Sequence, residues 1–398
     1  MTRRIGVFLA TLLCVTLVWR QDANAMGEGD PVTLSIRVGA EYTDNRDSLP
    51  DKDDNTDFNI APRIDAFLRG ERLTLNFFYE PIYRYRTDPS PIQNESELHH
   101  DVGLNVDVQA APRLVFFGRE RFNVTDDPAI VEEGTTYRRD SSYTMNRAEL
   151  GARWMVGKLG RLSASGRHRI KMYEERLVAR ESDEDRWVAE MSYWQQLSPT
   201  LGMSLTGSYE EFDFRSRLGL QRGFSAVSGG ASLEKALGAG VRAAVWAGYK
   251  ELTYDDSALG RDSAPYANAL LRFETHPGLR VFVRGGYTLR ESGVYPYVSQ
   301  THASVGLDGQ WDLSARWTLD VGGVLRQSDY DADAVPTGIA GSAYRGGEED
   351  AIVLWGAATF AFNETTSLML RQQHENVDSD VGATFKRNAT RLELSKKF

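Results

Sequence analysis

The final sixteen residues, 383–398, constrain the fold of this chain more than any other stretch. Read backwards in steps of two, they place Phe398, Leu394 and Leu392 on one side and Glu393 and Arg391 on the other. Side chains alternate across a β-strand, so this spacing predicts a strand with one apolar face and one charged face. The rest of the chain decides whether that apolar face meets a protein core or lipid.

The same period of two recurs from Val32 to the end, in segments of roughly 10 to 15 residues separated by connections of two kinds. Short connections with turn-forming residues lie at 69–71, 110–112, 158–160, 198–200, 238–240, 277–278, 314–316 and 363–365. Longer, polar connections lie near 44–57, 87–96, 125–142, 176–184, 215–222, 255–262, 291–296, 328–349 and 376–382. Short and long connections alternate, which predicts about eighteen antiparallel strands.

Residues 1–25 have the pattern of a signal peptide. Arg3 and Arg4 precede an apolar run at 5–19, and Ala23-Asn24-Ala25 forms a cleavage site. The run is shorter than the roughly 20 residues of a spanning helix. Residues 26–398 are therefore the predicted mature domain. The single cysteine, Cys14, lies in the signal, so disulfides are not expected to hold this domain together.

Composition narrows the choice of partners. The formal net charge is −10, which argues against nucleic acid. The mean hydropathy of −0.42 resembles that of a water-soluble protein, but a barrel with one lipid-facing and one wet face gives the same value.

A charge on a lipid face near the midplane costs about 2 to 4 kcal/mol, so the apolar parity is expected to face outward and the charged parity inward. The prediction is an all-β, transmembrane, antiparallel up-and-down barrel with short periplasmic turns and long extracellular loops. The upper part of the last strand departs from this pattern, because Phe385 lies on the charged parity while Lys386 and Asn388 lie on the apolar one. Either the strand leaves the membrane there or it carries a bulge.

Projecting the charged parity inward predicts the residues that line the lumen. They are Arg37, Arg63, Arg84, Arg119, Arg121, Arg153, Arg167, Arg169, Lys171, Arg242, Arg280, Arg284, Arg326, Arg371, Arg391, Glu80, Glu149, Glu190, Trp194 and Trp246. Arginine forks suit anionic or hydroxyl-rich solutes, and the two tryptophans could stack on sugar rings. Ordinary salt bridges across the lumen would produce the same pattern. The predicted membrane-interface residues are Trp154, Trp311, Trp317 and Phe398.

Other kinds of site have weaker support. The two longest connections, 125–142 and 328–349, are the candidates for a loop that narrows the channel. His99-His100-Asp101 is the cluster closest to a hydrolase site, but no nucleophile motif accompanies it, so no enzyme activity is expected. Neither a metal nor a cofactor is expected.

A final strand of alternating apolar residues that ends in Phe resembles the closing strand of bacterial outer-membrane barrels, which the barrel assembly machinery reads. Residues 32–398 as a whole resemble the putative β-barrel porin type 2 family, and more distantly the eighteen-stranded alginate export porin. The resemblance implies a location among the lipid and lipopolysaccharide of the outer membrane. It also implies passive export of an exopolysaccharide, with a periplasmic polysaccharide-export protein as partner. The alternatives are a general or anion-preferring diffusion porin, and a rim enzyme or adhesin.

Overall fold

The computed structural model describes residues 31–46, 48, 50, 54–89, 94–125, 142–215, 221–292, 294–336, 346–382 and 384–398. The predicted signal peptide at 1–25 lies outside these residues. Most of the connection at 125–142 and the central part of the one at 328–349 also lie outside them.

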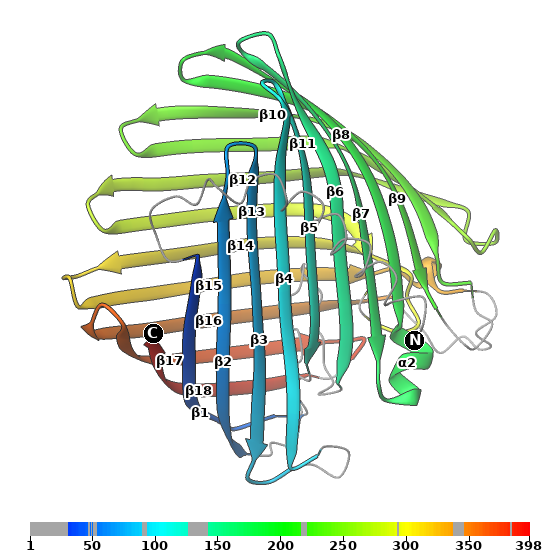
Figure 1. Cartoon of the computed structure of the whole chain (residues 1–398). Coiled ribbons are helices and arrows are strands. Elements are labelled where there is room, and N and C mark those ends of the chain that lie inside the picture. Colours follow the sequence, from blue (N-terminus) through cyan, green and yellow to red (C-terminus); the bar gives the residue numbers. More distant parts are fainter. Residues whose placement is uncertain are drawn as a thin grey trace.

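Eighteen antiparallel strands form one sheet that closes on itself, because β1 pairs with both β2 and β18. Figure 1 shows β1 in blue beside β18 in red. The strands are β1 (Val32–Thr43), β2 (Asn55–Arg69), β3 (Leu73–Arg86), β4 (Ser96–Ala111), β5 (Leu114–Thr125), β6 (Tyr143–Val156), β7 (Gly160–Tyr173), β8 (Glu184–Ser198), β9 (Leu201–Phe214), β10 (Phe224–Gly238), β11 (Val241–Tyr254), β12 (Arg261–His276), β13 (Leu279–Glu291), β14 (Ser299–Asp312), β15 (Trp317–Tyr330), β16 (Gly347–Asn363), β17 (Thr366–Ser379) and β18 (Phe385–Lys397). Closure removes the exposed strand edges at which sheets aggregate. The predicted barrel and its strand count are confirmed.

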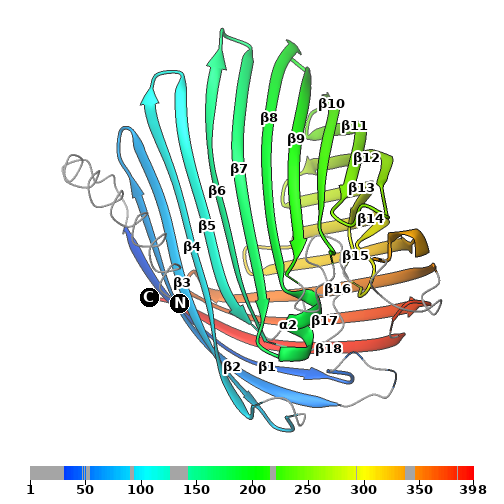
Figure 2. The ribbon, with the colours of Figure 1, turned by 90° about the vertical axis from the view of Figure 1, so that its right-hand side faces the viewer.

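The short turns fall where the sequence predicts them, at one end of the barrel (Figure 2). Gly240 and Gly278 occupy two of these turns with φ of 74° and 79°. Glycine adopts this left-handed region without the steric cost that a side chain would add. These residues therefore allow β10–β11 and β12–β13 to reverse direction within a few residues.

One face of the sheet is apolar and exposed, and the other is charged and more buried. In β1, Leu34 is exposed, whereas Arg37 forms an ion pair with Glu80 of β3. Arg169 of β7 lies 3.3 Å from Glu291 of β13, and because these strands are not neighbours, the contact must cross the interior. Paired residues share a face, so the register carries this inner face from strand to strand. The charged face is therefore the inner one.

This polarity reverses at the long-loop end. Phe212 and Phe214 of β9 lie on the inner parity and are 1% and 3% exposed, while Glu211 and Asp213, which alternate with them, face outward into solvent. Beyond the apolar belt a strand has water outside and packed side chains inside, as in a soluble protein. The rule that the apolar parity faces outward therefore fails at this end of the barrel.

The closing strand shows the same reversal. Phe385 is 2% exposed and packs inside against Ala351 and Val377. Asn388 faces outward and donates from Nδ2 to the Asp44 carboxylate at 2.8 Å. Pairing of β18 with β17 continues through this stretch without a register shift. Of the two expected explanations, the strand therefore leaves the apolar belt and carries no bulge.

Among the described residues, two short helices lie at the long-loop end: α2 (Arg176–Ser182) between β7 and β8, and the 3-10 helix η1 (Ala332–Ala334) after β15. Val178 and Ala179 of α2 pack on Tyr143 and Tyr173. Within the described ranges, no helix has the length and apolar character needed to span a membrane.

Candidate functional site

The predicted lumen-lining residues all fall on the inner parity of their strands, as the register places them. Arg153 pairs with Asp107 at 2.6 Å, and Arg167 with Glu190 at 2.9 Å. Hydrogen bonds or ion pairs with other inner-face groups are also made by Arg37, Arg63, Arg84, Arg119, Arg121, Arg280, Arg284, Arg371 and Arg391. Their role in conduction stays a prediction.

The remaining predicted residues sit in varied surroundings. Lys171 lies over the rings of Tyr143 and Tyr173, and Arg326 is buried at the long-loop end. Trp194 lies 5.7 Å from the guanidinium carbon of Arg161, and Trp246 is partly exposed. The list is completed by Arg242 and Glu149, which lie on the inner parity.

An arginine row crosses four adjacent strands on the inner face. Arg121 of β5, Arg147 of β6, Arg169 of β7 and Arg186 of β8 are consecutive cross-strand partners. Like charges directly opposite each other destabilise a sheet, so the arrangement is costly for the fold. Two ion pairs offset part of this cost. The Asp101 carboxylate lies 2.9 Å from the Arg121 guanidinium, and the Glu184 carboxylate lies 3.0 Å from the Arg169 guanidinium. The sequence reasoning missed Arg147 and Arg186, although the parity of Glu149 and Glu190 was sufficient to place them inside.

A cavity of about 390 Å³ adjoins this row. It is lined by Arg147, Glu149, Arg167, His168, Arg169, Arg186 and Val188. Four guanidinium groups and one carboxylate among these residues favour an anionic group in the cavity.

Residues 294–299 enter the long-loop mouth of the barrel and are called the inner segment here; they comprise the end of the β13–β14 connection and the first residue of β14. The paired part of β12 and β13 runs from Ala267–Tyr287 down to His276–Leu279, so the upper part of β13 is released to bend inward. Arg222 Nη2 donates to the carbonyl oxygen of Tyr297 at 3.0 Å. The inner segment therefore narrows the mouth.

Apolar packing fixes the inner segment in place. Val298 is fully buried in a cluster with Phe212, Phe214, Phe224, Ala226, Leu252, Tyr254 and Leu289. The Tyr254 and Ser299 hydroxyls lie 2.6 Å apart, and the Tyr297 ring packs on Tyr330 at 5.3 Å. The segment thus rests on β9, β10, β11 and β15.

Glu291, at the start of this bend, is the centre of an ion-pair network across the lumen. Its Oε1 accepts from Arg169, Arg186 and Arg290 at 3.3, 3.1 and 3.1 Å. Arg186 Nε also lies 2.8 Å from Glu210, which accepts a hydrogen bond from Lys250 at 3.0 Å. The network joins the arginine row to the inner segment.

The sequence did not single out this segment. The connection predicted at 291–296 does lie between β13 and β14, but the pattern of period two does not show that this connection enters the mouth of the barrel. The signal was present, because Val294, Tyr295, Pro296, Tyr297 and Val298 form an apolar run within a loop. Most of the candidate at 125–142 and the central part of the one at 328–349 lie outside the described residues, so the prediction that they narrow the channel is untested.

His100 and Asp101 do not form a catalytic pair. Neighbouring residues on β4 face opposite sides, so His100 contacts Tyr79 on the outer face at 3.1 Å while Asp101 binds Arg121 on the inner face. Within the part of the chain that the structure describes, no group of three His, Cys, Asp or Glu residues is placed to hold a metal ion.

The predicted interface aromatics are exposed at the short-turn end. Trp311 and Trp317 flank the β14–β15 turn, Trp154 precedes the β6–β7 turn, and Phe398 ends the chain. The Trp317 ring packs on Phe360 at 4.9 Å. Their contact with a membrane surface stays a prediction.

Comparison with known proteins agrees with this architecture. The family model described as Putative beta-barrel porin 2 matches residues 32–398. The chain belongs to this family. A search of curated proteins gave no match.

Solved structures similar to this porin share its fold at low sequence identity. Acinetobacter baumannii OccAB2 has a TM-score of 0.52 at 13% identity, with 93% of this chain and 99% of that chain covered. A BenF-like porin from Pseudomonas fluorescens Pf-5 has a TM-score of 0.51 at 9% identity, covering 94% and 100%. Pseudomonas aeruginosa OccK2 (OpdF) has a TM-score of 0.50 at 11% identity, with 94% of this chain and 99% of that chain covered. At these identities the likeness concerns the fold alone.

Proposed function

We propose that this porin lies in the bacterial outer membrane and exports an acidic exopolysaccharide through its lumen. The observation that carries the proposal is the arginine row of β5–β8 beside the 390 Å³ cavity. Opposed arginines cost stability, so their presence on the inner face favours a role in binding anions. An acidic polysaccharide supplies repeated carboxylates together with hydroxyl groups that bind guanidinium forks.

Export through such a lumen needs weak binding at several successive places, so that the polymer can enter and leave. The inner face meets this need, because several of its arginines are already partnered by acids. Arg167 donates to Glu190 and Arg153 to Asp107, and each carboxylate competes with a passing anion for the same guanidinium. Movement is then passive and is driven by synthesis of the polymer.

Partners follow from this location. The closing strand, β18, would be read by the barrel assembly machinery, and the outer apolar belt would contact lipid and lipopolysaccharide. A periplasmic polysaccharide-export protein would deliver the polymer to the short-turn end.

A second candidate function is diffusion of small anionic solutes. The inner segment and the Glu291 network favour it, because both narrow the mouth through which a polymer would leave. Export therefore requires the inner segment to move, whereas small solutes require less movement.

The experiment uses a strain that secretes an acidic exopolysaccharide and lacks the gene, complemented with variants of equal surface abundance. The test variant changes Arg167, Arg280 and Arg284 to Gln; their side chains are 45%, 46% and 53% exposed, so removing their charge leaves no buried partner unpaired. The matched control is Arg261→Gln, whose side chain is 72% exposed on the outer face. We expect the triple variant to lower released polymer and the control to match the wild type. Normal polymer release without the protein, with free entry of small sugars in a liposome-swelling assay, would instead establish the diffusion porin.

A further inference from the structure

A second cavity, of about 230 Å³, lies on the inner wall nearer the short turns. It is lined by Phe117, Glu149, Arg153, Ser163, Ser165, Glu190 and Ser192. Glu149 also lines the larger arginine cavity, so the two cavities lie next to each other along the wall. A solute that enters from the short-turn end meets the smaller cavity first.

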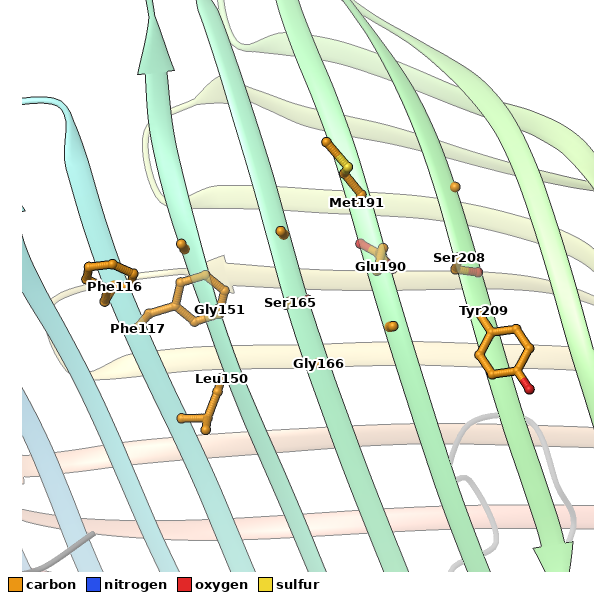
Figure 3. A pocket seen from close by; sticks show the side chains of 14 residues that line it. Phe116, Phe117, Leu150, Gly151, Ser165, Gly166, Glu190, Met191, Ser208 and Tyr209 are labelled. Carbon is orange, nitrogen blue, oxygen red and sulfur yellow. The ribbon is translucent and has the colours of Figure 1, made fainter.

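The ring of Phe117 forms the apolar part of this cavity. Its cross-strand partner is Gly151, and a Cβ at that glycine would lie only 2.4 Å from the Phe117 Cζ. The ring therefore lies against bare backbone, an arrangement in which an aromatic side chain covers a neighbouring glycine. Figure 3 shows the ring of Phe117 reaching from its own strand across to Gly151, with Ser165 and Glu190 on the next strands.

Charged groups surround the ring. The guanidinium carbons of Arg153 and Arg119 lie 4.7 and 5.4 Å from its centroid. Both arginines are tied to Asp107, Arg153 at 2.6 Å and Arg119 at 3.7 Å, which fixes their position beside the ring. Cations over an aromatic face are attracted by its negative potential.

The strand register places the residues of this cavity in two neighbouring rows across the sheet. Phe117, Gly151, Ser165 and Glu190 form one row across the strands. Arg119, Glu149 and Arg167 form the next row, two residues further along. Two residues along a strand span roughly 7 Å, and the two strand spacings from β5 to β7 add roughly 10 Å sideways, so Phe117 and Arg167 lie roughly 12 Å apart at the backbone, more than one sugar unit.

We propose that Phe117 and its surroundings form a docking site for a uronate unit of an acidic polysaccharide. The C–H face of the pyranose packs on the Phe117 ring, its hydroxyls bond to the serines and Glu149, and a carboxylate further along the polymer meets Arg167. The inference rests on the proposed function, since it names the sugar chemistry that the lumen selects. It also gives the barrel a first contact on the side from which a nascent polymer arrives.

The test measures blockade of the ion current through single reconstituted barrels, with the probe added on the short-turn side. The probes are a galacturonate hexamer and a glutamate hexapeptide, which carry the same number of side-chain or ring carboxylates but differ in the pyranose. The variant is Phe117→Leu, and the matched control is Phe116→Leu, which removes the adjacent ring on the outer face. We expect Phe117→Leu to weaken binding of the galacturonate hexamer by about threefold to tenfold, as for loss of one aromatic contact. Binding of the glutamate hexapeptide should stay unchanged. The control should change neither.

If Phe117→Leu weakened binding of both probes equally, or weakened binding of neither, the proposal of a docking site would be overturned. Phe117→Trp provides a second check, because it keeps an aromatic face and should retain binding of the galacturonate hexamer if stacking is the cause. Failure of the docking site is distinguishable from failure of export. A barrel that is needed for polymer release but shows no ring-dependent blockade refutes only the docking site. Ring-dependent blockade in a barrel that is dispensable for polymer release refutes only export.

Discussion

Glu291→Gln should open the mouth of the barrel. The carboxylate of Glu291 is 4% exposed and accepts from three guanidinium groups, so the change leaves buried cations short of a counter-charge. Loss of one partner of a buried ion pair costs about 3 to 5 kcal/mol. Arg186 keeps Glu210 and Arg169 keeps Glu184, which places the cost at the lower end, about 3 kcal/mol.

The expected effect is a shift between closed and open forms of the mouth. Since 1.4 kcal/mol corresponds to a factor of ten, the open-to-closed ratio should rise about a hundredfold. Single-channel recording measures this ratio as the fraction of time spent at the largest conductance. Glu190→Gln is the matched control, because the Arg167–Glu190 pair is 45% and 37% exposed and should contribute less than about 1 kcal/mol. An open fraction equal in Glu291→Gln, Glu190→Gln and wild type would refute the reasoning.

Two further predictions concern packing. Phe212→Ala removes a 1% exposed ring from the apolar cluster and should destabilise the barrel by about 3 to 5 kcal/mol, seen as a lower temperature of band shift on a denaturing gel. Leu205→Ala, on the outer face of the same strand, should change this band-shift temperature little. Equal changes in the two variants would contradict an apolar core inside the barrel. Gly151→Ala should displace Phe117, because the new Cβ falls 2.4 Å from the ring, whereas Gly166→Ala meets nothing within 4 Å. Proteolysis and band-shift temperature should separate the two glycine variants; identical behaviour would argue against the close approach at Gly151.

The sequence predicts the barrel well because two of its signals are local. Strand parity follows from covalent geometry, and turn residues such as Gly240 and Gly278 mark reversals of the chain. The strand count and the position of the closing strand follow directly from these two signals. The inner-face placement of the arginines follows as well, since an apolar belt leaves them no other side.

The mouth could not be predicted in the same way. Alternation tells which residues share a face, but it does not tell where a strand passes from lipid into water. Phe212 and Phe385 are apolar residues on the parity that carries charges elsewhere, and they pack inside the barrel. The Glu291 network joins β7, β8 and β13, strands that are far apart in the chain, so no local pattern records it.

The most direct test of an arginine-lined anion path is the reversal potential of single barrels in a salt gradient. Anion preference in the wild type, which falls when Arg167, Arg280 and Arg284 are changed to Gln and persists in Arg261→Gln, is the expected result. Cation preference in the wild type, or an anion preference that the triple variant leaves unchanged, would contradict the central claim.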